Sequence, residues 1–189
     1  MTADTHSVLV VTKDSKLSAM IGALLTPPLF EARIVNDFNE ARRITSERVY
    51  NIILSDYSDG DGLDFATDIS ESLSTILLLT PQTLYEEVSY RVEGYGIITV
   101  PTPFDQFNFY STIKTAIAVQ YKVQILQSQT TKLKVKMEEI RLVNRAKMLL
   151  MQNEKMTEEE AHHFIEKEAM NRGLKKTALA EEIIQGKVR

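Results

Sequence analysis

The 189-residue sequence contains no cysteine, which excludes disulfide bridges and thiolate metal sites and is typical of proteins from a reducing cytoplasm. No apolar stretch approaches the roughly 20 residues that a membrane-spanning helix needs. The first residues, MTADTHSVLVV, lack the basic segment of a signal peptide. There is also no G-x-S-x-G, P-loop or G-x-G-x-x-G motif, so we expect a cytoplasmic protein that is not an enzyme and binds no cofactor.

Charge is distributed unevenly along the chain. The net charge is −4, but residues 1–112 carry −9, residues 113–134 carry +4 and residues 135–189 carry +1. An acidic N-terminal part and a neutral-to-basic C-terminal part are compatible with nucleic-acid contact by the C-terminal part. The excess is small, and a solvated helical face explains most of these lysines equally well.

Five apolar runs alternate with helical segments through the first 110 residues. The runs read SVLVV, EARIV, NIILS, STILLL and GIITV. This alternation predicts an α/β domain, a doubly wound parallel sheet with helices on both faces. Ligands of such sheets bind outside the carboxyl ends of the strands.

Polar residues follow these runs at the predicted carboxyl edge. Asp56, Thr80 and Thr102 follow the third, fourth and fifth runs, and Pro103-Phe104 come next after Thr102. Over about residues 5–120 the chain resembles the receiver family of response regulators. The resemblance implies that Asp56 stands at the phosphoacceptor position and that Thr80 stands where the family reads the phosphoryl group.

The resemblance fails at the residues that bind Mg²⁺ and at the position of the family's lysine. The family has an acidic pair for Mg²⁺ after the first strand, where this chain has Thr12-Lys13 with Asp14 one step later. The family also has a lysine at the position of Thr102. Phosphoryl transfer relies on cations to neutralise the equatorial oxygens, and Mg²⁺ binds carboxylates. We therefore predict an inactive phosphoacceptor site without a metal.

Two hypotheses follow for the carboxylate at the centre of this site. Lys13 could pair with Asp56 in the place of the metal, or Asp56 could be satisfied by local hydrogen bonds. The alternative to an inactive site is conventional phosphorylation of Asp56 by a histidine kinase.

From Thr112 to about Asn153 no glycine or proline interrupts the chain. Apolar residues recur at heptad spacing, which predicts a two-stranded coiled coil over residues 113–140 and hence a homodimer. The alternative is a single long helix that packs on its own receiver domain. Ala116 begins the heptad pattern, Thr130 and Asn144 interrupt it, and the predicted seam consists of Val119, Val123, Leu126, Leu133, Met137 and Ile140.

Residues 141–189 predict a small three-helix all-α domain. Thr157 and Glu160 form a capping-box pair at the start of its second helix, and Gly173 ends that helix. The apolar residues of the second helix are Ala161, Phe164, Ile165, Ala169 and Met170, and those of the third are Leu179, Ile183 and Ile184.

This C-terminal segment resembles the ANTAR family, the RNA-binding domain of bacterial transcription antiterminators. Met148 departs from the glycine that the family often has. The matching residues are Arg145-Ala146-Lys147, Leu149-Leu150-Met151, Glu160-Ala161, Ala169-Met170 and Ala180. The resemblance implies binding to leader RNA with two short stem-loops, by two linked modules.

Five cations are candidate RNA contacts, each with a solvated surface cation as the alternative. Arg145 and Lys147 come from the resemblance, and Arg172, Lys175 and Lys176 lie beside the Gly173 turn. After residue 134 the only aromatic residue is Phe164, so the aromatic platforms of other RNA-binding modules are absent.

One further pair, His162-His163, suggests a metal site. Its spacing does not match H-E-x-x-H, and a surface pair is expected.

Together these features predict a receiver-like domain over 1–112, a dimerisation helix over 113–140 and an ANTAR module over 141–189. The predicted function is antitermination by leader-RNA binding, with a sensor protein or a histidine kinase as a further partner. The alternative from another class is a protein–protein adaptor that binds no RNA.

Overall fold

The five apolar runs form strands in the computed structural model, which describes residues 5–187. All neighbouring strands are parallel, in the order β2-β1-β3-β4-β5. The strands are β1 (His6–Val11), β2 (Phe30–Val35), β3 (Ile52–Asp56), β4 (Thr75–Pro81) and β5 (Ile98–Thr102). The predicted doubly wound sheet is confirmed.

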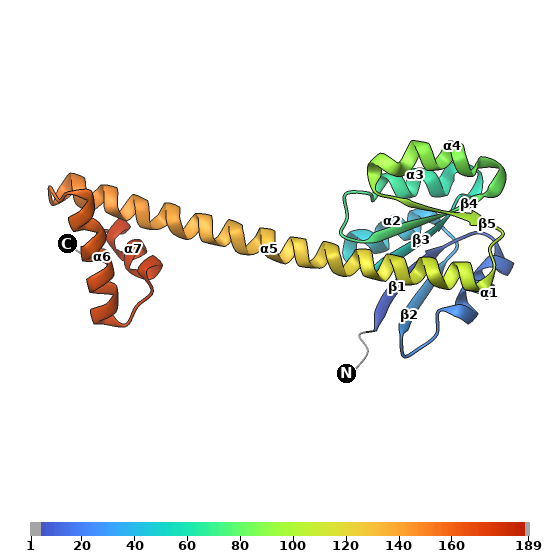
Figure 1. The fold of residues 1–189 in the computed structure, drawn as a ribbon, viewed down its shortest axis with the longest axis horizontal. Helices are drawn as coiled ribbons and strands as arrows, with labels where there is room; N and C mark the ends of the chain where they lie inside the picture. Colours follow the sequence, from blue (N-terminus) through green and yellow to red (C-terminus); the bar gives the residue numbers. More distant parts are fainter. Residues whose placement is uncertain (1–4, 188–189) are drawn as a thin grey trace. The chain divides into compact units, whose positions relative to one another are not determined.

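Helices cover both faces of this sheet (Figure 1). The helices are α1 (Ser15–Leu24), α2 (Phe38–Glu47), α3 (Asp61–Asp68), α4 (Tyr85–Val92) and the long α5 (Gln106–Asn153). Short 3₁₀ turns lie at Ser58–Gly60, Gln82–Leu84 and Glu93–Tyr95.

Strand β1 shows why its apolar run is continuous. Val8 and Val10 pack toward α1 and α5, whereas Leu9 and Val11 pack toward α2. Successive side chains of a strand point to opposite faces, so a strand covered on both faces must be apolar at every position.

The chain forms two compact units, Met1–Ile125 and Leu126–Arg189. The first unit takes in the beginning of α5 because that part of the helix covers the sheet. Its residues Phe109, Ile113, Ala116 and Ile117 are buried in the sheet's core. The heptad pattern places Ala116 in the coiled-coil series, but Ala116 is fully buried within its own domain.

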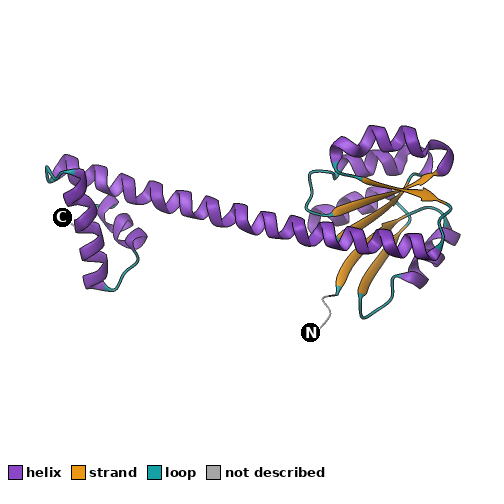
Figure 2. Ribbon diagram, viewed as in Figure 1, coloured by secondary structure: helices purple, strands orange, loops and turns teal. Residues whose placement is uncertain are grey.

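The second unit contains the rest of α5 with α6 (Glu158–Arg172) and α7 (Lys176–Ile184), and Figure 2 shows all three as helices. Its core consists of Ala146, Leu150, Ala161, Ile165, Ala169, Leu179, Ala180 and Ile183. No helix among residues 5–187 is long and apolar enough to cross a membrane.

Local signals fix the ends of α6 as predicted. Glu160 N–H donates to Thr157 Oγ1 (3.2 Å), and Thr157 N–H donates to Glu160 Oε2 (2.8 Å). Gly173 has a φ of 62° and ends the helix, where Leu174 N–H donates to the Ala169 carbonyl (2.9 Å).

Met170 was wrongly placed on the apolar face of α6, because its side chain is 76% exposed. Met170 follows Ala161 by nine residues, which is two and a half turns at about 3.6 residues per turn. It therefore lies opposite the buried Ala161.

Gly62 is fixed by a close approach of two backbone segments. A Cβ atom at this position would lie 1.7 Å from the carbonyl oxygen of Asp56. Helix α3 can therefore begin against the end of β3 only if residue 62 has no side chain.

We predict that Gly62→Ala destabilises the first unit by about 1–3 kcal/mol, because the loop after Asp56 must shift. Gly94→Ala is the matched control, since a Cβ there would meet nothing within 4 Å, and its effect should stay within about 0.5 kcal/mol. Thermal unfolding followed by circular dichroism measures both variants. Equal stability of the two variants would contradict the close approach.

Candidate functional site

Asp56 ends β3 at the carboxyl edge of the sheet and is half-buried. Its Oδ2 atom accepts hydrogen bonds from the hydroxyls of Thr12 (2.9 Å) and Ser58 (3.0 Å). The Thr12 hydroxyl in turn accepts from Asp14 N–H (3.0 Å). Local hydrogen bonds therefore satisfy Asp56, which agrees with one of the two hypotheses.

Lys13 does not pair with Asp56, so the other hypothesis is wrong. Its ammonium lies 2.6 Å from Asp61 Oδ2, and both side chains are more than half exposed. The hydrogen bond from Lys13 lowers the pKa of Asp61, and the same bond raises the pKa of Lys13. The ammonium thus stays in water, while two neutral hydroxyls bind the half-buried carboxylate.

The other residues of this edge do not converge on Asp56. Thr80 is fully buried, and its hydroxyl donates to the Leu78 carbonyl of its own strand (3.3 Å). Thr102 ends β5 and is half-buried. Asp14 caps α1, accepting from Lys16 N–H (2.7 Å) and the next backbone N–H. Its carboxylate is therefore committed to the helix end.

Ser58 is a site residue that the sequence analysis missed. Ser58 and Asp59 both have positive φ values, 43° and 56°, which are uncommon for residues other than glycine. The turn brings the Ser58 hydroxyl back to the carboxylate two residues earlier. A serine two positions after Asp56 was the available signal, since Ser and Asp side chains bond locally in turns.

We predict that acetyl phosphate with Mg²⁺ labels Asp56 poorly, because Thr12 and Lys13 stand where the family has its Mg²⁺-binding carboxylates. Mass spectrometry of the intact protein measures the labelling. A variant with Thr12→Asp, Lys13→Asp and Thr102→Lys restores the carboxylates and the lysine and should be labelled more. Stoichiometric, Asp56-dependent labelling of the unmodified protein would contradict an inactive site.

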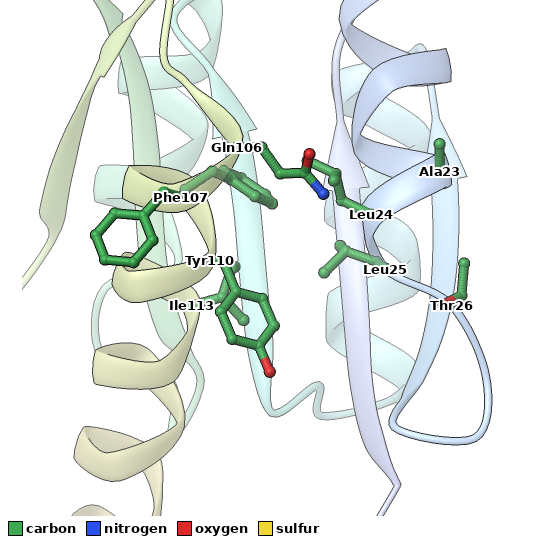
Figure 3. Close-up of a pocket in the computed structure, with 9 residues that line it drawn as sticks. Ala23, Leu24, Leu25, Thr26, Gln106, Phe107, Tyr110 and Ile113 are labelled. Carbon is green, nitrogen blue, oxygen red and sulfur yellow. The ribbon is translucent and has the colours of Figure 1, made fainter.

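A groove of about 590 Å³ lies between the end of α1 and the beginning of α5 (Figure 3). Leu24, Leu25 and Ile113 line it, and Phe107 at its rim is 78% exposed. The side chains that line it in the described part of the chain are all apolar or uncharged. The groove therefore suits an apolar contact.

Three of the five candidate RNA contacts form ion pairs inside the C-terminal unit. Lys147 Nζ of α5 lies 2.8 Å from Glu158 Oε1 of α6, and the Lys147 side chain is only 14% exposed. Arg172 of α6 pairs with Glu168 (2.6 Å) and with Glu182 of α7 (3.2 Å).

Lys176 completes this set of ion pairs by pairing with Glu166. These pairs connect α5 to α6 and α6 to α7. Lys176 lowers the pKa of Glu166, and Lys147 lowers that of Glu158, in each case first through a side-chain hydrogen bond. Carboxyls with lowered pKa values stabilise the fold above their unfolded pKa of 4.5, and this contribution disappears as the pH falls through the folded value.

Arg145 and Lys175 differ from the other three candidates. Both are exposed, and within residues 5–187 neither forms an ion pair. The Gly173 turn therefore does not bring Arg172, Lys175 and Lys176 together as one free cationic group.

His162 lies 3.4 Å from Glu166, and no three His, Cys, Asp or Glu residues in the described part of the chain are grouped as a metal site.

The predicted seam of α5 is uncovered along most of its length. Val123 is half-buried, and the other five residues are 40–63% exposed. Val119 has the lowest exposure of these five and Leu133 the highest. The alternative, in which the long helix packs on its own receiver domain, therefore describes only the first turns of α5.

Residues 131–184 match the family model of the ANTAR domain. The transcriptional regulatory protein PdtaR of Mycobacterium tuberculosis, in two strains, is 27% identical over 126 residues. The match covers 66% of this chain and 62% of PdtaR, which is less than two thirds of the relative's length.

Solved receiver domains share the fold of the first unit. The signal receiver domain of an HD domain-containing protein from Pseudomonas fluorescens Pf-5 aligns with a TM-score of 0.57 and 17% identity, over 63% of this chain and 91% of that one. The receiver domain of a Vibrio parahaemolyticus LuxO repressor protein aligns with a TM-score of 0.58 and 12% identity, over 65% and 98%.

Proposed function

Because the chain joins a domain of the receiver fold to a C-terminal ANTAR domain, we propose that it is a transcription antitermination regulator that binds structured leader RNA as a coiled-coil dimer. Binding would favour the antiterminator form of the RNA, so that RNA polymerase continues. Such a regulator acts in the cytoplasm and catalyses no reaction. The receiver-like domain would receive its input without phosphorylation.

The match of residues 131–184 to the ANTAR domain carries this proposal. The hydroxyl cluster around Asp56 supports an input that does not use the phosphoacceptor. Control by a histidine kinase is the alternative, and it predicts that Asp56 can accept a phosphoryl group, which the labelling experiment with acetyl phosphate tests.

The dimer is supported by the position of the exposed apolar residues on α5. Leu126, Leu133 and Ile140 recur every seven residues, and each is about half exposed in a single chain. Water-exposed apolar residues at this spacing are buried when two such helices pair. The core of the ANTAR module uses Ala146 and Leu150, which belong to other heptad positions, so the seam and the module do not compete.

We predict that the protein is a dimer at micromolar concentration and that Leu126→Asp with Leu133→Asp makes it monomeric, because pairing would bury unpaired charge. Val135→Asp is the matched control. Val135 is also about half exposed but lies off the seam, so this variant should remain a dimer. Sedimentation equilibrium distinguishes the states, and a monomeric unmodified protein would contradict the coiled coil.

RNA binding is tested by titrating a synthetic RNA of two short stem-loops, with duplex DNA of the same length as the comparison. We expect the RNA to bind more tightly and its binding to weaken as salt rises. Arg145→Ala should weaken binding and lower the salt slope by about one unit if it removes one phosphate contact. The helicity of this variant should be unchanged, because Arg145 is exposed.

Lys147→Ala separates RNA contact from folding. Lys147 is mostly buried and pairs with Glu158, so its replacement should lower the stability of the C-terminal unit as well as any RNA affinity.

A protein that binds neither the RNA nor the DNA would favour the adaptor alternative. The apolar groove between α1 and α5 is the observation that favours a protein partner, such as a sensor protein. Failure of RNA binding together with a stable dimer would therefore move the function to protein contacts.

A further inference from the structure

Positive charge in the second unit is concentrated on helix α5. Residues 126–153 contain six Lys and Arg residues and two Glu residues, a net of +4. Residues 154–187, which form α6 and α7, contain six Lys and Arg residues and eight Glu residues, a net of −2. A polyanion is therefore attracted to α5 and repelled by much of α6 and α7.

The first turn of α6 is the most acidic part of the unit. It contains Glu158, Glu159 and Glu160 in succession. Three cations of the unit are already paired with carboxylates, namely Lys147, Arg172 and Lys176. Phosphate contacts at these three residues would require existing ion pairs to break.

Three cations on α5 lie immediately beside the seam. If Met137 and Ile140 occupy the a and d positions of a heptad, then Lys134 and Arg141 occupy e positions and Lys136 occupies a g position. All three are exposed. We call Lys134, Lys136 and Arg141 the cationic flanks of the seam.

Pairing of two copies would bring the cationic flanks against each other. In a parallel coiled coil, a g residue of one helix meets the following e residue of the other, and stable pairs usually join opposite charges there. Here Lys136 of one copy would meet Arg141 of the second copy. Glu138 pairs with Arg141 along the same helix (2.8 Å), but both side chains are about 70% exposed, so this bond is weak.

We propose that the cationic flanks bind RNA phosphates and that RNA binding and helix pairing therefore strengthen each other. The proposal rests on the proposed function and adds a location and a coupling to it. Pairing of two helices concentrates like charges on both sides of the seam, which opposes dimerisation. Phosphates bound along the flanks neutralise these charges, and by thermodynamic linkage the dimer binds RNA more tightly than the monomer does.

Lys134 and Arg141 are seven residues apart, which is about 10 Å along a helix at 1.5 Å per residue. Arg145, which is also exposed on α5, continues the positively charged surface of the helix beyond Arg141. The RNA surface would thus begin on the dimerisation helix, before the residues that form the module's core.

The test compares two triple variants of the full-length chain with equal loss of charge. The flank variant carries Lys134→Gln, Lys136→Gln and Arg141→Gln. The control variant carries Lys155→Gln, Lys167→Gln and Lys187→Gln, three exposed lysines outside α5 for which residues 5–187 provide no ion pair. Circular dichroism and sedimentation establish that both variants are folded and dimeric.

The RNA probe is the same synthetic RNA of two short stem-loops, titrated across a range of salt concentrations. For each phosphate that the flank variant no longer binds, the salt slope should fall by about one unit. The affinity of the flank variant should also be lower than that of the unmodified protein. At 0.1 M salt the difference should be roughly five- to eightfold for each lost phosphate contact, if the two affinities are taken to be equal at 1 M salt. The control variant should stay within about twofold of the unmodified protein, because its lysines lie in the part of the unit with net negative charge.

Dimerisation without RNA provides a second readout. Salt screens like charges, so the dimer of the unmodified protein should tighten by roughly severalfold between 0.05 and 0.5 M salt. The dimer of the flank variant should respond little to salt.

Normal RNA affinity in the flank variant would overturn the proposal while leaving RNA binding intact. An equal or larger loss of affinity in the control variant would also overturn it, by placing the RNA surface on α6 and α7. A dimer that weakens as salt rises would contradict the like-charge contact across the seam. Absence of RNA binding in the unmodified protein would instead reject the proposed function itself.

Discussion

The structure depends on one uninterrupted helix, α5, whose successive faces perform different tasks. An α-helix turns by about 100° per residue, so the position of a residue in the chain fixes the face on which it lies. In the first unit Phe109 and Ile113 of this helix are buried against the sheet. In the second unit Ala146 and Leu150 are buried against α6 and α7. Between these regions Leu126 and Leu133 remain exposed and available to a second helix.

The first unit retains the receiver architecture but has a different polar cluster at its carboxyl edge. Neutral hydroxyls of Thr12 and Ser58 bind the Asp56 carboxylate, and the ammonium of Lys13 pairs instead with Asp61 at the surface. The Asp56 carboxylate thus receives two hydrogen bonds from within the chain. This arrangement supports the proposal that the domain receives its input without phosphoryl transfer, and the apolar groove between α1 and α5 is a candidate surface for that input.

The features that depend on local sequence were predictable. The strands follow from continuous apolar runs, and the ends of α6 follow from the Thr157–Glu160 capping box and from Gly173. The ion pairs between helices were not predictable, because the choice of partner depends on which helices meet in three dimensions. Lys147 matches a family motif, yet its mostly buried pairing with Glu158 became visible only in the folded unit. The exposure of Met170 could have been foreseen from its helical angle.

The central claim is that this protein binds leader RNA through its C-terminal unit. Ultraviolet crosslinking in cells, followed by recovery of the protein and sequencing of the attached RNA, tests it most directly. The account predicts reads that concentrate in leader segments with two short stem-loops upstream of coding regions, and their loss when residues 135–189 are deleted. Reads no more abundant than those from the deleted protein, or spread evenly over all transcripts, would contradict it.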